Sequence, residues 1–173
     1  MAGTEDEHVA VQLHELEGRL RRHASELAIY LVYDRPARVA ERPGLARTLF
    51  AERCVTDDQL ERMIEAFRSQ GAYAEVFDGE QPFLAALTSG RLNALGRRLQ
   101  VAYNGIGSGV GPGGYIAGRK GLVPLIADSY RMVCANSDAH ACVVARHKFH
   151  CFTILRAGGG STPAIWHYRP DAG

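Results

Sequence analysis

Residues 27–33, with the sequence LAIYLVY, are the longest uninterrupted apolar run in the chain and decide its fold class. The run is rich in branched and aromatic residues and is closed by Asp34 and Pro36, which is typical of a strand buried on both faces of a sheet. A membrane-spanning helix needs about 20 apolar residues, so this run is too short to be one. We therefore expect residues 27–33 to be the first strand of a buried sheet.

The sequence on both sides of this strand alternates between helix and strand periods. Helices are predicted over residues 9–27, 57–70, 83–95 and 138–156, and strands over 73–77, 99–103, 132–135 and 164–168. The second helix is the best marked, because Thr56 offers a capping oxygen and Gly71 ends the pattern. Parallel strands need helix-length crossovers. The alternation therefore predicts an α/β fold, a three-layer sandwich with a mostly parallel sheet and helices on both faces.

Length and composition fit one domain of this kind. The chain has 173 residues, of which 46% are hydrophobic, enough for a single core without disulfide or metal support. We expect an N-terminal amphipathic helix in residues 1–26 and the α/β domain in residues 27–173. Residues 1–8 contain three acids and no Lys or Arg, which does not resemble a secretory signal, so we expect a cytoplasmic protein with no membrane partner.

Charge divides the sequence into two halves of opposite sign. Residues 1–86 hold 10 Lys and Arg against 16 Asp and Glu, whereas residues 87–173 hold 10 against 3. The second half should attract anions. Its basic residues are dispersed and lack interleaved aromatic platforms, so a small phosphorylated ligand fits better than nucleic acid. The alternative is that the two halves attract each other or a partner subunit.

The cysteines and histidines favour a structural role over a metal centre. Cys54, Cys134, Cys142 and Cys151 form no C-x-x-C pair, and we expect them to be buried as small hydrophobic side chains. On a helix, His147 and Cys151 are the two side chains of the 140–151 cluster with the spacing that one ion can share. A zinc ion would need further ligands from elsewhere.

A glycine-rich segment follows the strand predicted at residues 99–103. Residues 104–114 contain six glycines, among them Gly107 and Gly109, whose backbone N–H groups can turn toward an anion. Three interpretations stay open: a ligand-facing or lid-like loop, a flexible connection, or a dinucleotide fingerprint formed by Gly109, Gly111 and Gly114. The last lacks the acidic residue about 20 positions on that would hold a ribose.

A second anion-binding position is predicted at the start of the last helix. Ser137 is expected to cap this helix, which leaves backbone N–H groups at the carboxyl end of the sheet. Lys148 lies further along and is one of two lysines beside 18 arginines. It is a candidate for a phosphate contact or an ordinary surface lysine.

Residues 132–166, MVCANSDAHACVVARHKFHCFTILRAGGGSTPAIW, resemble the end of the N-terminal, pre-ATP-grasp domain of ATP-grasp ligases of the D-alanine:D-alanine ligase type. In that family a short strand leads into a helix with a small-residue face and a lysine, followed by a glycine turn and a proline-led strand. The positions that match the pattern are Ser137, Ala141, Ala145, Lys148, Gly159 or Gly160, and Pro163.

The resemblance implies a full-length enzyme that uses ATP and Mg²⁺ to phosphorylate a carboxylate and lets an amine attack the acyl phosphate. The ATP-binding domains would lie beyond residue 173, so the chain alone is expected to be inactive. By the same resemblance Lys148 would contact nucleotide phosphates. Gly107, Gly109 and Ser137 would contact an amino-acid or peptide substrate, with Glu41 a displaced substitute for the family's substrate-binding glutamate.

Several departures bear on the substrate. The family's acid-histidine motif after the first strand is absent, so D-alanine is not expected, and Phe152 stands where the family has a second lysine. Two other classes of function stay open: a standalone nucleotide- or anion-binding α/β module, and a non-catalytic domain that dimerises through its first helix. In each case a homodimer is one expected partner.

Overall fold

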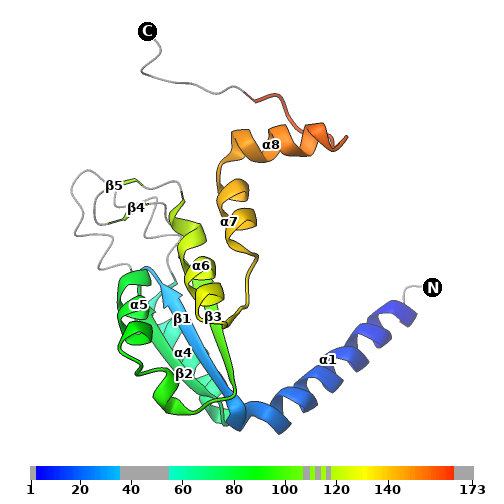
Figure 1. Cartoon of the computed structure of the whole chain (residues 1–173). Helices are drawn as coiled ribbons and strands as arrows, with labels where there is room; N and C mark the ends of the chain where they lie inside the picture. Colours follow the sequence, from blue (N-terminus) through cyan, green and yellow to red (C-terminus); the bar gives the residue numbers. More distant parts are fainter. Residues whose placement is uncertain (1–2, 36–54, 107–109, 112–113, 116–117, 166–173) are drawn as a thin grey trace.

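The structure is a computed structural model that describes residues 3–35, 55–106, 110–111, 114–115 and 118–165. Its centre is a sheet of four parallel strands in the order β2-β1-β3-β6 (Figure 1). These strands are β1 (Leu27–Tyr33), β2 (Tyr73–Asp78), β3 (Leu99–Gly105) and β6 (Val133–Cys134). The predicted α/β class with a parallel sheet is therefore confirmed, and residues 27–33 form its fully buried strand β1.

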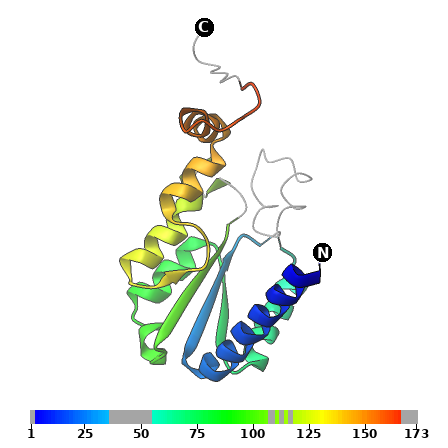
Figure 2. The same ribbon diagram turned by 90° about the vertical axis from the view of Figure 1, so that its right-hand side faces the viewer.

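Helices cover the sheet on both faces, as Figure 2 shows. The helices are α1 (Gly3–His23), α4 (Asp57–Ser69), α5 (Glu80–Thr88), α6 (Leu122–Ser129), α7 (Ala139–Arg146) and α8 (Lys148–Ala157). Short 3-10 turns cover Ala24–Glu26, Asn93–Leu95 and Arg119–Gly121, and β4 (Val110–Gly111) pairs antiparallel with β5 (Gly114–Tyr115). Helix α4 packs on one face of the sheet, whereas α5 and α6 pack on the other.

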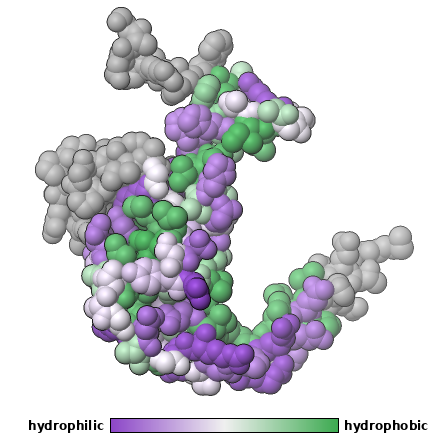
Figure 3. All heavy atoms as spheres, in the orientation of Figure 1, coloured by the Kyte–Doolittle hydropathy of each residue, from purple (hydrophilic) through white to green (hydrophobic). Residues whose placement is uncertain are grey.

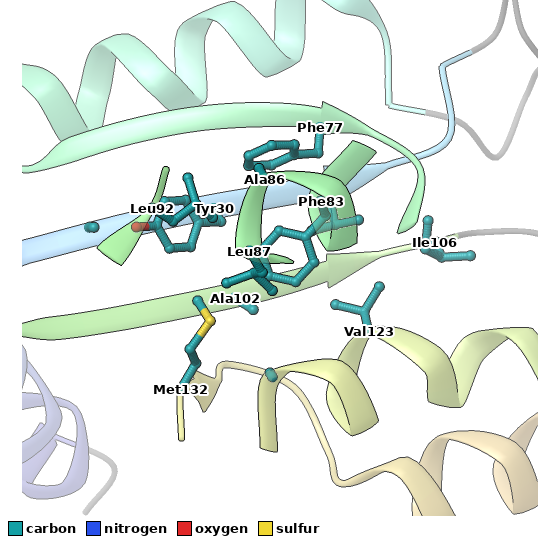
Figure 4. Close-up of a cluster of buried hydrophobic side chains, with 13 residues drawn as sticks. Tyr30, Phe77, Phe83, Ala86, Leu87, Leu92, Ala102, Ile106, Val123 and Met132 are labelled. Atoms are coloured by element: carbon teal, nitrogen blue, oxygen red, sulfur yellow. The ribbon is translucent and has the colours of Figure 1, made fainter. Parts of the chain in front are cut away.

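Two hydrophobic cores lie on the two faces. The core under α5 and α6 is centred on Tyr30, which is in contact with the rings of Phe77 and Phe83 (Figure 4). The core under α4 contains Leu31 and Leu60, neither of which is more than 1% exposed. Because successive residues of a strand point to opposite faces, β1 supplies both cores, which explains its unbroken apolar sequence.

Helix α4 begins where the sequence predicts. The Thr56 hydroxyl accepts a hydrogen bond from the backbone N–H of Gln59 at 3.3 Å, and the Gln59 side chain accepts one from the Thr56 N–H at 2.9 Å. This reciprocal pair is a capping box. It fixes the start of the helix independently of the rest of the fold.

Gly79 holds the ends of β1 and β2 together. Its φ of 86° lies in the left-handed region, which residues with a side chain rarely adopt. In this conformation its N–H donates to the Tyr33 carbonyl at 2.7 Å and α5 starts immediately afterwards at Glu80. The turn therefore brings Glu80 to the carboxyl ends of the strands.

Buried tyrosines in β1 predict a loss of stability at alkaline pH. Burial raises the pKa of Tyr30 and of Tyr33 to about 12. In the unfolded chain a tyrosine ionises near 10, so the folded state keeps its full advantage below about pH 10 and loses it as the pH approaches 12. At pH 11 we expect each tyrosine to lower the free energy of unfolding by about 1.4 kcal/mol relative to neutral pH.

Urea unfolding of the chain and of the double variant Tyr30→Phe/Tyr33→Phe at pH 8 and pH 11 checks this. The variant should lose less stability between the two pH values, because phenylalanine does not ionise. Equal losses in both proteins would contradict the prediction.

The structure corrects the prediction of one long helix over residues 138–156. The helix is broken at His147 into α7 and α8, and α8 turns away from α7 (Figure 1). His147 has φ −91° and ψ 90°, outside the helical region, and its ring accepts a hydrogen bond from the backbone N–H of His150 at 3.5 Å. The break separates Lys148 from the helix that contains Ala141 and Ala145.

Other predicted bounds also change. The first helix ends at His23 rather than residue 27, because Leu27 already belongs to β1. The helix predicted over residues 83–95 starts at Glu80 and ends at Thr88. Of the strand predicted over residues 164–168, Ala164 and Ile165 are not in a strand, and residues 166–168 lie outside the described residues. Three of the four cysteines predicted to be buried, Cys134, Cys142 and Cys151, are partly exposed, and Cys54 lies outside the described residues.

Candidate functional site

The carboxyl ends of β1 and β3 lie next to each other at the point where the strand order reverses. From β1 the chain goes through α4 to β2 on one side, and β3 later pairs on the other side of β1. In open α/β sheets ligands bind in the crevice outside such a point. A ligand site is therefore expected at this edge, among the residues that follow β1, β2, β3 and β6.

Three charged side chains are buried together at this edge. Asp34 directly follows β1, Glu80 opens α5, and Arg119 lies in the 3-10 turn before α6. Their exposed fractions are 2%, 5% and 1%. The Arg119 guanidinium donates to both oxygens of Asp34 at 2.8 and 2.7 Å, and to both oxygens of Glu80 at 3.0 and 2.6 Å.

This cluster ties three segments of the carboxyl edge to one another. Burial by itself lowers the pKa of Arg119, but the hydrogen bonds to Glu80 and Asp34 outweigh it and hold the pKa above its ordinary value. The guanidinium therefore stays charged. Planar bidentate pairs also fix orientation, so the cluster sets the position of the 3-10 turn Arg119–Gly121 and of helix α6, which follows it.

A pocket of about 730 Å³ lies beside this turn, between the ends of β3 and β6 and helix α7. Its walls are Asn104, Lys120, Ala135, Asn136, Ser137, Ala141, Cys142, Ala145 and Arg146. Three of the α7 residues in this wall, Ala141, Cys142 and Ala145, have small side chains, which leaves the space open. The helix lies close to this turn. A Cβ atom on Gly121 would lie 2.7 Å from a methyl group of Val143, so the close approach requires glycine at this position.

Two asparagines connect the walls of the pocket and form its frame. The Asn104 side-chain amide donates to the Lys120 carbonyl at 2.8 Å, and its backbone N–H donates to the Asn136 side-chain oxygen at 2.6 Å. The Asn104 carboxamide oxygen also accepts from the Ile106 N–H at 3.3 Å. Asn104 therefore connects β3 with the segment after β6 and with the turn that contains Lys120.

The pocket is positively charged. Lys120 and Arg146 both line it and are half-buried. Among the described residues, no carboxylate lies within ion-pair distance of either side chain. Two cations beside amide and hydroxyl groups favour a ligand with a carboxylate or phosphate group.

Cys142 is the thiol that lines this pocket. Its Sγ lies 3.4 Å from the Ser137 carbonyl oxygen, to which it donates. Burial raises the pKa of the Cys142 thiol. A nucleophilic cysteine needs the opposite shift, so we assign Cys142 to the pocket wall and not to covalent chemistry.

No family model, curated protein or solved structure matches the chain. The resemblance of residues 132–166 to ATP-grasp ligases therefore stays a prediction.

The structure brings one of the sequence-predicted site residues to the pocket. Ser137 lines it, as expected for a residue at the carboxyl end of β6. Lys148 is exposed in the first turn of α8 and is not part of the pocket wall, so its contact with nucleotide phosphates stays a prediction. Glu41, Gly107 and Gly109 lie outside the described residues.

The predicted capping role of Ser137 is wrong. Helix α7 is capped by the next residue, Asp138, whose carboxylate accepts a hydrogen bond from the Ala141 N–H at 2.9 Å. Ser137 lies one position earlier and is exposed. Its hydroxyl is therefore placed at the pocket without serving the helix.

The described residues do not form a metal site. Within the ranges that the structure covers, no three His, Cys, Asp or Glu side chains come together in a way that could hold an ion. Two carboxylates at the carboxyl edge, those of Asp34 and Glu80, are already bound to Arg119. The residues described here therefore offer no ligand set for Mg²⁺.

No helix of the described chain combines the length and apolar character needed to cross a membrane.

Sequence reasoning missed the residues that define this edge. Asp34 and Glu80 each follow a strand directly or by one glycine, and a charged residue at such a position is a signal that could have been used. Arg119 and Lys120 follow the glycine-rich segment and have no such local marker. Arg146 lies in the last turn of α7, where basic residues are common, so its position in the sequence does not mark it as a site residue.

Proposed function

We propose that this chain is the N-terminal domain of an ATP-dependent carboxylate-amine ligase, whose pocket receives the carboxylate of an amino-acid or peptide substrate. The observation that carries the proposal is the placement of Lys120, Arg146 and Ser137 in one pocket at the carboxyl edge of a parallel sheet. This is the position at which α/β sheets bind ligands. The likeness of residues 132–166 to the ligase family, which includes Ser137, gives separate support.

The pocket residues have different roles in binding the carboxylate. Lys120 and Arg146 offset the negative charge of the carboxylate, and Asn136 and Ser137 provide amide and hydroxyl groups that can orient it. Asn104 is engaged in the frame and acts by holding Lys120 in place. In the proposed reaction the substrate carboxylate accepts the terminal phosphoryl group of ATP, ADP leaves, and an amine then displaces phosphate and loses a proton to give the amide.

An assay of the full-length protein encoded by the natural reading frame tests the proposal. We expect ADP release from Mg-ATP that requires a carboxylate substrate, and hydroxylamine should trap the acyl phosphate as a hydroxamate. A charged hydrogen bond contributes about 1.5–3 kcal/mol, so Lys120→Ala should raise the KM for the carboxylate by about tenfold or more.

The matched control is Arg62→Ala, which removes an exposed cation from α4, away from the pocket. A reading frame that ends directly after Gly173 would defeat the proposal. So would the absence of ADP release with amino acids and short peptides supplied in pairs as carboxylate and amine.

The second candidate is a standalone anion-binding module, which the cationic pocket favours by itself. This function predicts that the chain alone binds inorganic phosphate or ATP in calorimetry, whatever follows it in the gene. Binding of phosphate together with a reading frame that ends at Gly173 would select this candidate over the ligase.

A further inference from the structure

Helix α1 has an apolar seam exposed to solvent. The seam consists of Val9, Leu13, Leu16 and Leu20, whose side chains are between 39% and 61% exposed. Within the described chain, the element against which α1 packs closely is the 3-10 turn that follows it. Figure 3 shows hydrophobic surface along one side of this projecting helix and hydrophilic surface along the other. Contiguous apolar surface of this kind marks an interaction site.

The spacing of the seam fits pairing with another helix. Its members follow one another at steps of four, three and four residues, which is the heptad spacing of a two-stranded coiled coil. The helix has 21 residues and is therefore about 31 Å long. It projects away from the sheet (Figure 1), so a second helix can reach the seam without displacing the α/β body.

The distribution of charge along α1 favours a second copy of this helix in the antiparallel orientation. Before Val9 the sequence has three acids and no Lys or Arg, whereas Arg19, Arg21 and Arg22 follow Gly18. An antiparallel copy of the same helix places the acidic half of each against the basic half of the other. A parallel copy would place the two basic halves side by side, which is unfavourable.

We propose that the chain forms a homodimer in which α1 pairs antiparallel with α1 of a second copy. In the register that buries the whole seam, Leu13 packs against Leu16 of the second copy and Val9 against its Leu20. On the flanks of this register, Glu17 lies beside Ala10 of the second copy and Arg19 beside its Gln12, so that like charges do not meet. The inference does not depend on the proposed ligase function.

Sedimentation or light scattering of the 173-residue chain over a wide range of concentrations tests the dimer. The monomer mass is 18.9 kDa, and we expect the measured mass to approach twice this value as concentration rises. The double variant Leu13→Glu/Leu16→Glu should remain at 18.9 kDa. Val11→Glu is the matched control, because Val11 is 58% exposed but lies on the opposite side of the helix, and it should still dimerise.

A wild-type chain that stays monomeric at all concentrations would overturn the proposal, as would a dimer that persists in the Leu13→Glu/Leu16→Glu variant. Circular dichroism of each variant verifies that the α/β body stays folded. Direction is tested by oxidising a mixture of Leu13→Cys and Leu16→Cys chains, with the native cysteines replaced by serine. Crosslinks between the two variants support the antiparallel register, and crosslinks of each variant only with itself refute it.

Discussion

Replacing Arg119 with methionine should lower the free energy of unfolding by about 3–5 kcal/mol. The guanidinium makes four hydrogen bonds to Asp34 and Glu80, and all three residues are at least 95% buried. The variant leaves two carboxylates in the interior without their cation. Removing one member of a buried ion pair has this cost because the remaining charge has lost both its partner and its water.

The effect is large compared with the total stability of a domain, which is about 5–15 kcal/mol. Urea unfolding followed by circular dichroism measures it. The control is Arg91→Met, which removes the ion pair with Glu75 on the surface, where the expected loss is about 0–1 kcal/mol. A loss in Arg119→Met no greater than that in Arg91→Met would contradict the account of the cluster.

A variant that keeps the charge separates charge from geometry. Arg119→Lys retains a cation but has one nitrogen in place of the planar fork, so it cannot bind both carboxylates in bidentate fashion. We expect its stability to lie between those of the wild type and Arg119→Met. Since the cluster positions the turn that contains Lys120, the same variant should also weaken anion binding in the pocket.

The elements that were predicted correctly have local causes. The strand at residues 27–33 is apolar throughout because both of its faces are buried, and α4 starts at a capping box formed by residues three positions apart. Such patterns need no knowledge of the tertiary structure. The parallel sheet follows from their order along the chain, because helix-length crossovers return each strand in the same direction.

The break between α7 and α8 has no comparable local signal. Residues 139–157 contain neither glycine nor proline, and their composition is compatible with one continuous helix. The break depends on the conformation of His147 and on its ring, which caps the next helix. Ser137 and Asp138 likewise are adjacent capping residues, and the path of the chain out of β6 decides which of them caps α7.

The candidate site depends on contacts that are distant in sequence. Arg119 is 85 positions from Asp34 and 39 from Glu80, and Asn104 meets Asn136 across 32 positions. Sequence patterns such as helical periodicity or short motifs connect residues that are a few positions apart, so they do not reveal these contacts. The sequence predicted the edge of the sheet where a ligand would bind and Ser137 at that edge, whereas the two cations of the pocket required the three-dimensional structure.

Removing both cations from the pocket should abolish most of its affinity for anions. Each charged hydrogen bond is worth about 1.5–3 kcal/mol, so the double variant Lys120→Ala/Arg146→Ala should bind inorganic phosphate or dialanine at least about 100-fold more weakly than the wild-type chain. Isothermal titration calorimetry at low ionic strength measures this, because salt weakens contacts between exposed charges.

The control has to distinguish the loss of two cations in the pocket from the loss of two positive charges anywhere on the chain. Arg62→Ala/Arg98→Ala removes two exposed cations, one on α4 and one before β3, neither of which lines the pocket. It therefore changes the total charge by the same amount and should leave phosphate binding within about twofold, as expected for screened charges at a distance. If both double variants lose affinity equally, the attraction belongs to the basic half of the chain as a whole and the pocket at the carboxyl edge has no special role. Unchanged binding in Lys120→Ala/Arg146→Ala would place the anion elsewhere on the molecule.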